Sequence, residues 1–228
     1  MRVWQTIRAS ALARHLHDEA YAALVLAGGY EEAGDHGRFQ ARPGDVIFHE
    51  QLEAHLDRFP RSGVVLLNLP LPVACFIPGI AKVIDADSVA RVAERSCKDA
   101  VDLLCSMVVA EKPRFTDWPD ELAAALIENP SLRLSRWAEE KAIAPWAVSR
   151  GFSLVFGISP EAFRARIRAR QAWKLIRTSP APLAGIAAEL GFADQSHMTR
   201  SVKQLTGMGP RAWRCAANRF KTPPNSGV

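Results

Sequence analysis

The chain has 228 residues, 48% of them hydrophobic, which is enough to bury the cores of two domains of roughly 100 residues each. No apolar run approaches the about 20 residues that span a bilayer, and charges interrupt the first residues where a signal peptide is apolar, so we expect a cytoplasmic protein without a membrane partner. Residues 1–130 hold 13 Lys and Arg against 19 Asp and Glu, whereas residues 131–228 hold 16 against 5. A net charge of −6 followed by one of +11 predicts two domains with different partners, the second binding a polyanion.

The first part of the chain has the residue pattern of a β domain. Short apolar runs at residues 21–26, 46–48 and 64–67 are separated by glycines and prolines. This pattern is typical of a small antiparallel β-barrel or sandwich, which we place at residues 1–80.

A helical segment follows at residues 81–130. Apolar residues recur every three or four positions from Ser88 to Glu111, which predicts one long amphipathic helix that either packs on the β domain or pairs with a second copy of the chain. A shorter helix is expected at residues 120–127, between prolines. The four cysteines have no metal-binding spacing and are expected to be buried free thiols.

From Ser131 onward the pattern is helical, and residues 183–207 carry the most specific motif. Gly191 supplies the left-handed residue that ends one helix, Asp194 is a good N-cap for the next, and Gly207 ends that second helix. Two short helices joined by a tight turn form a helix-turn-helix, which presents its second helix to the major groove of DNA.

The second helix of this motif has a polar face. Met198, Val202 and Leu205 share the apolar side. The residues left to contact DNA are Gln195, Ser196, His197, Arg200 and Lys203. The amide of Gln195 suits adenine, the guanidinium of Arg200 suits guanine, and Lys203 is placed to meet phosphate.

An earlier segment, residues 134–157, repeats the pattern less cleanly. Its outward residues are Trp146, Ser149, Arg150 and Ser153. An arginine-rich helix from Ser159 to about Thr178 joins the two units and is roughly 28 Å long at 1.5 Å per residue. That is close to the about 34 Å between successive major-groove faces, so one chain is expected to read two adjacent turns of double-stranded DNA.

Residues 134–214 resemble the DNA-binding domain of the AraC/XylS family of bacterial transcription regulators. The matching signatures are residues 186–197, residues 207–214 and the linker at residues 163–172, in the family's order and spacing. The resemblance implies a transcription regulator rather than an enzyme, with RNA polymerase as a partner. The sequence leaves open a role as activator or as repressor. Gly151, inside the first expected recognition helix, departs from the family pattern. Because a glycine inside a helix costs about 1 kcal/mol relative to alanine, this departure suggests a looser first unit.

The N-terminal part is similar to the cupin-type β-barrel that often precedes this DNA-binding domain and senses a small molecule. His15 and His17 alternate along a strand and, with His55, are the candidate ligand-binding residues. Tyr21 stands where metal-binding cupins carry a glutamate, so a pocket without metal or cofactor is favoured over a metal centre. The alternatives are a cupin-type metalloenzyme with an appended DNA-binding domain and a nonspecific architectural DNA binder.

The expected fold class is therefore α+β. A cupin-like sensor barrel at residues 1–80 precedes a helical connector or dimerisation segment at 81–130. A domain with two helix-turn-helix units follows at 131–221, and a flexible tail at 222–228 ends the chain.

Overall fold

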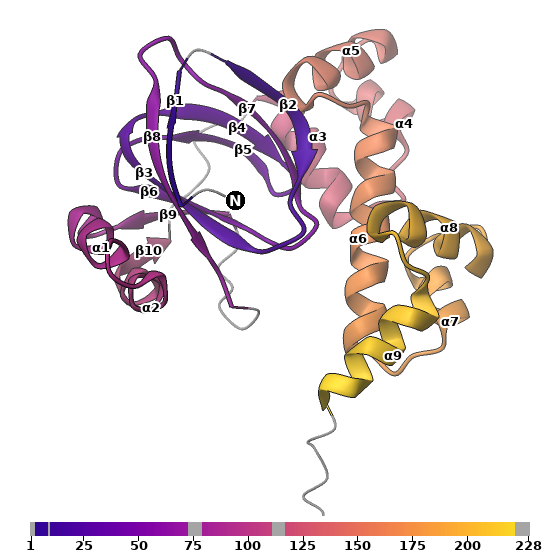
Figure 1. Cartoon of the computed structure of the whole chain (residues 1–228). Coiled ribbons are helices and arrows are strands. Elements are labelled where there is room, and N and C mark those ends of the chain that lie inside the picture. Colours follow the sequence, from indigo (N-terminus) through magenta and orange to yellow (C-terminus); the bar gives the residue numbers. More distant parts are fainter. Residues whose placement is uncertain (1–2, 9, 73–78, 111–116, 222–228) are drawn as a thin grey trace, which may run out of the picture. The chain divides into compact units, whose positions relative to one another are not determined.

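The computed structural model describes residues 3–8, 10–72, 79–110 and 117–221 (Figure 1). The chain divides into two compact units. Met1–Ala124 and Trp146–Ser159 form the first unit, and Ala125–Pro145 and Pro160–Val228 form the second. The first is rich in strands and the second is helical, which confirms the α+β class. The tail predicted at residues 222–228 lies outside the described residues.

The strands of the first unit form two antiparallel sheets. The six-stranded sheet has the order β1 (Trp4–Ile7), β8 (Val64–Pro70), β3 (Tyr21–Gly28), β6 (Asp45–His49), β9 (Gly79–Val83) and β10 (Val108–Ala110). The four-stranded sheet has the order β2 (Ala11–Leu16), β7 (Ala54–Arg58), β4 (Tyr30–Gly34) and β5 (Gly37–Ala41).

The two sheets share a core. Val25 and Ile47 of the six-stranded sheet are buried in one cluster with Tyr30 and Phe39 of the four-stranded sheet. Among the described residues, no ladder joins the sheets into a closed barrel. Two sheets on one core have the arrangement of a sandwich, and the cupin-like barrel expected at residues 1–80 is not confirmed.

The single long helix predicted for residues 88–111 is wrong. Two helices, α1 (Ala86–Ala93) and α2 (Cys97–Met107), take its place, because the Ser96 hydroxyl caps a new helix by accepting a hydrogen bond from the Asp99 amide. The chain then enters β10, which pairs with β9. The apolar spacing runs through both helices because both pack on the same face of the six-stranded sheet, where Val89 and Leu104 join one core cluster.

The cysteine prediction also needs a correction. Cys97 is free and half-buried, and Cys215 is free but exposed. Cys105 is disulfide-bonded, so it is not the free thiol that its isolated spacing suggested.

The second unit is built on a central helix. The helix α6 (Pro160–Thr178) contacts three others, α7 (Leu183–Glu189), α8 (Gln195–Thr206) and α9 (Pro210–Lys221) (Figure 1). The other helices among the described residues are α3 (Trp118–Glu128), α4 (Leu134–Glu140) and α5 (Pro145–Phe156). In the part of the chain that the structure describes, no helix combines the length and apolarity needed to cross a membrane.

Candidate nucleic-acid interface and ligand cavity

The start and end of α8 follow the local signals in the sequence. The Asp194 carboxylate accepts a hydrogen bond of 2.6 Å from the amide of His197, which caps the first turn. Gly191 ends the preceding helix at φ 67° and Gly207 ends α8 at φ 74°, a left-handed conformation that favours glycine. The predicted turn between the two helices is confirmed.

The helix α8 separates a buried face from an exposed one. Met198 and Val202 are fully buried. The exposed residues of the predicted reading face are Gln195, Ser196, Arg200 and Lys203. His197 is half-buried, with its ring centroid 5.3 Å from that of Phe192. Four of the five predicted contact residues on α8 are therefore free of packing, and His197 is held at the turn.

Several arginines around α6 bind the backbone of the same unit. Arg168 donates to the carbonyls of Pro130 (2.6 Å) and Gly191 (3.0 Å). Arg164 donates to the carbonyl of Leu132 at 3.0 Å. These side chains brace the helix ends and the turn that presents α8.

The earlier candidate helix, α5, belongs to the first unit. Trp146 is 71% exposed, Ser149 and Arg150 are exposed, and Ser153 is half-buried. The nine predicted DNA contacts are thus divided, four on α5 in one unit and five on α8 in the other.

Gly151 has a structural reason that the sequence alone did not show. A Cβ at this position would lie 2.4 Å from Cζ2 of Trp118, so only glycine lets the indole approach the α5 backbone this closely. Gly151 therefore permits a close contact between Trp118 and α5 within the first unit, and its presence does not indicate that α5 is loose.

The carbonyl end of α5 is held by two arginines of the four-stranded sheet. Arg14, on β2, donates to the carbonyl of Phe156 at 3.1 Å. Arg58, on β7, donates to the carbonyl of Val155 at 3.0 Å and also to that of Leu154. Cations at the C-terminus of a helix complement its dipole. These contacts could not be predicted from the sequence, because the partners are 96 to 142 positions apart.

The first unit also encloses a cavity of about 120 Å³. Its lining includes the three predicted ligand-binding histidines, whose ring centroids lie 5.0 Å apart for His15 and His17, 4.4 Å for His15 and His55, and 5.3 Å for His17 and His55. The structure therefore brings together the histidines that the sequence grouped.

Further polar residues lie beside these histidines. Tyr21 stacks on His49 with centroids 4.3 Å apart, and its hydroxyl is 3.4 Å from Nε2 of His55. Glu32 is buried and accepts a hydrogen bond of 3.1 Å from the Tyr30 hydroxyl. No spacing in the sequence reveals Glu32 or His49, because they lie on strands of two separate sheets and approach each other only in the folded core.

Burial controls the protonation of this cluster. It raises the pKa of Glu32 well above its ordinary value, and the carboxyl group of Asp57 adds to that effect. Burial raises the pKa of Asp57 to about 7. Burial, followed by the neighbouring imidazole of His49, holds the pKa of His55 well below its ordinary value. The imidazole of His55 is therefore neutral at neutral pH.

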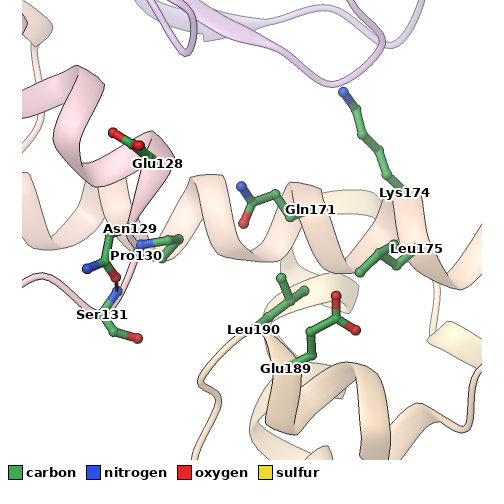
Figure 2. Close-up of a pocket in the computed structure, with 9 residues that line it drawn as sticks. All are labelled: Glu128, Asn129, Pro130, Ser131, Gln171, Lys174, Leu175, Glu189 and Leu190. Carbon is green, nitrogen blue, oxygen red and sulfur yellow. Dashed lines mark hydrogen bonds between the residues drawn. The ribbon is translucent and has the colours of Figure 1, made fainter.

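A larger groove lies in the second unit, with a volume of about 510 Å³ (Figure 2). Its lining residues are Glu128, Asn129, Pro130, Ser131, Gln171, Lys174, Leu175, Glu189 and Leu190. None of them is buried. An open groove without buried polar groups is a weaker ligand site than the cavity of the first unit, whose lining includes the buried Glu32, His55 and Asp57.

The helical part of the chain matches known proteins. Residues 137–216 match the family model of a helix-turn-helix domain. The chain is similar to the virulence regulon transcriptional activator VirF of Yersinia enterocolitica and to the thermoregulatory protein LcrF of Yersinia pestis, with 30% identity to each over 36% of this chain and 35% of theirs. The chain therefore spans about a third of the length of these relatives.

The chain also resembles solved structures at lower sequence identity. A probable AraC family transcriptional regulator from Rhodopseudomonas palustris is 21% identical over 42% of this chain and 93% of that chain, with a TM-score of 0.39. ToxT from Vibrio cholerae is 10% identical over 94% of this chain and 98% of that chain, with a TM-score of 0.42. The family match shows that residues 137–216 carry a helix-turn-helix domain, as the turn, caps and closing glycine in the sequence predicted.

Proposed function

We propose that the protein is a transcription regulator that recognises a specific DNA sequence through α8. The observation that carries this proposal is the exposed polar face of α8, backed by the buried Met198 and Val202. A helix held in this way by a helix-turn-helix fits the major groove. Location in the cytoplasm follows from such a role.

The chemistry of the face suits base recognition. The amide of Gln195 matches the donor and acceptor pair of adenine, and the guanidinium of Arg200 matches the two acceptors of guanine. Lys203, two turns from the start of α8, is placed for phosphate. The side chain of Ser196 either donates or accepts.

We further propose α5 as a second reading helix, with Trp146, Ser149 and Arg150 as its contacts and Ser153 at the edge. Reading by both helices requires about two turns of DNA. Selection of sequences from a random DNA pool by the purified chain, followed by footprinting, tests the proposal. Protection of one face over about two helical turns supports it, protection of a single turn leaves α8 alone as the reader, and equal binding to all sequences contradicts specific recognition.

The first unit offers a route for regulation. The strands β2 and β7, which carry Arg14 and Arg58, also carry His15 and His55 of the cavity. We propose that an effector bound by His15, His17 and His55 alters the hold of these strands on α5. A cavity of about 120 Å³ admits an ion or a very small molecule, since sites for drug-sized ligands are about 300–1,000 Å³. RNA polymerase and a second copy of the chain remain predicted partners.

A further inference from the structure

Three buried side chains from three strands meet between the two sheets. They are Glu32 on β4, His49 on β6 and His55 on β7, with exposed fractions of 1%, 2% and 2%. One ligand atom of each lies within 4.8 Å of those of the other two. One carboxylate and two imidazoles at this separation form a typical donor set for a divalent transition metal.

Polar atoms in this cluster have no hydrogen-bond partner. Among the described residues, Oε1 of Glu32, Nδ1 of His55 and Oδ1 of the neighbouring Asp57 are buried without one. Buried polar atoms are normally paired with protein or with a bound group, since an unpaired one is costly. These atoms therefore point to a ligand that the protein alone does not provide.

One separation within the cluster fits a metal better than a hydrogen bond. Nε2 of His49 lies 3.6 Å from Oε2 of Glu32, which is too far for a good hydrogen bond. Two ligand atoms that are each about 2.0–2.2 Å from a tetrahedral ion lie about 3.4 Å apart. The two side chains thus need little movement to share an ion.

The local charge favours a cation. The carboxyl groups of Glu32, Glu53 and Asp57 are all buried around the cluster. Arg14, the nearest guanidinium that influences Glu32, is engaged with Asp35 and with backbone carbonyls. A divalent ion would supply the positive charge that buried carboxylates require.

We propose that the core of the first unit, beside its cavity, binds one divalent first-row transition metal ion through Glu32, His49 and His55. The open coordination positions would face the cavity lined by His15 and His17. This proposal rests on the proposed function, and it identifies the effector of the proposed regulator as a divalent metal ion. It is measured without DNA, so failure of metal binding and failure of DNA recognition are distinguishable.

A second donor set shares one residue with the first. His15, His17 and His55 also bring their ligand atoms within 4.8 Å of one another. His15 and His17 are only half-buried, and Nδ1 of His15 lies 3.0 Å from the carbonyl of Ala13. The unpartnered carboxylate oxygen of Glu32 is absent from that set, and this difference favours the deeper site.

The test uses the full chain, stripped with a chelator and titrated with Co²⁺, whose visible absorption reports the ligands directly, and separately with Zn²⁺ by calorimetry. We expect one equivalent per chain. Glu32→Gln and His49→Asn should each weaken binding by at least tenfold, whereas His15→Asn and His17→Asn should retain one equivalent.

His36→Asn is the matched control, since His36 lies outside the lining of the cavity and outside both donor sets. Circular dichroism of each metal-free variant monitors the fold. If His49→Asn does not fold, the near-isosteric Glu32→Gln alone tests the proposal. No stoichiometric binding by the unsubstituted chain overturns the proposal. Loss in His15→Asn and His17→Asn with full binding in Glu32→Gln and His49→Asn also overturns it.

Discussion

The guanidinium of Arg14 donates a hydrogen bond of 3.1 Å to the carbonyl of Phe156, the last residue of α5. Arg14 is followed directly by His15, which lines the cavity. Neighbouring residues of a strand point to opposite faces. The strand β2 therefore carries a contact with α5 and a wall of the cavity at adjacent residues.

Removal of these arginines should loosen α5. Arg14→Ala deletes a charged donor to a helix carbonyl, a contact typically worth about 1.5–3 kcal/mol, and Arg58→Ala does the same without unpairing Asp35. Hydrogen exchange should become faster at residues 145–156 and stay unchanged at residues 195–206. The exposed Arg61→Ala is the control, and unchanged exchange in both variants would show that the arginines do not hold α5.

Arg200→Ala should reduce specific binding by about 1–3 kcal/mol and relax the preference at one base pair. Lys203→Ala should instead weaken all sequences alike, because a phosphate contact carries no sequence information. Arg91→Ala, which removes one charge from α1 in the first unit, controls for the loss of net charge. Equal losses in all three variants on all sequences would argue against base recognition by α8.

The N-cap of α8 should be measurable in stability. Asp194→Ala removes the acceptor for the His197 amide and should lower the free energy of unfolding by about 0.5–2 kcal/mol. Asp194→Asn keeps a capping oxygen and should cost much less. Chemical denaturation of the two variants decides the matter, and identical losses would mean that charge rather than capping matters.

Two glycines in helices should respond oppositely to alanine. Gly185→Ala should stabilise by about 0.5–1 kcal/mol, since the nearest atom to a new Cβ is Cδ of Pro182 at 3.9 Å. Gly151→Ala should destabilise by about 1–3 kcal/mol, because its Cβ would strike Trp118. Adding Trp118→Ala should remove most of the penalty at position 151. A penalty that persists in the double variant would place the strain elsewhere.

The acidic pair at the start of α3 should make stability depend on pH. Asp120 and Asp117 both bind Arg38, and burial raises the pKa of Asp120 to about 6. A carboxyl with a raised folded pKa stabilises most below its ordinary pKa, and that stability is lost as the pH rises through 6. The free energy of unfolding, measured relative to Asp120→Asn, should therefore fall between pH 4 and pH 7. Parallel curves for the two proteins would rule out this titration.

The helix α8 was predictable because its signals are local. Asp194, Gly191 and Gly207 act on the turn in which they lie, so a sequence window of about 25 residues contains the whole argument. The buried pair of Glu32 and His49 was not predictable, because these residues approach only when β4 and β6 fold into separate sheets that face one core.

The boundary errors have a physical cause as well. The apolar period from Ser88 onward continues across the break at Ser96, since both helices use the same face of the sheet. Periodicity reports which side is buried and is insensitive to a cap between two helices. In the same way, Gly151 suggests helix weakness until Trp118 is seen against it.

The arginines of the second unit that bind backbone carbonyls reduce the number of basic side chains that can contact DNA phosphate. Three arginines donate hydrogen bonds to backbone carbonyls: Arg164, Arg168 and Arg214. Their charge still contributes to the electric field around the second unit, but those donors are not available to bind phosphate. The number of ions displaced from DNA on binding depends on the number of phosphate contacts and not on the number of basic residues. The dependence of affinity on salt should accordingly be shallower than the 16 Lys and Arg after residue 130 would suggest.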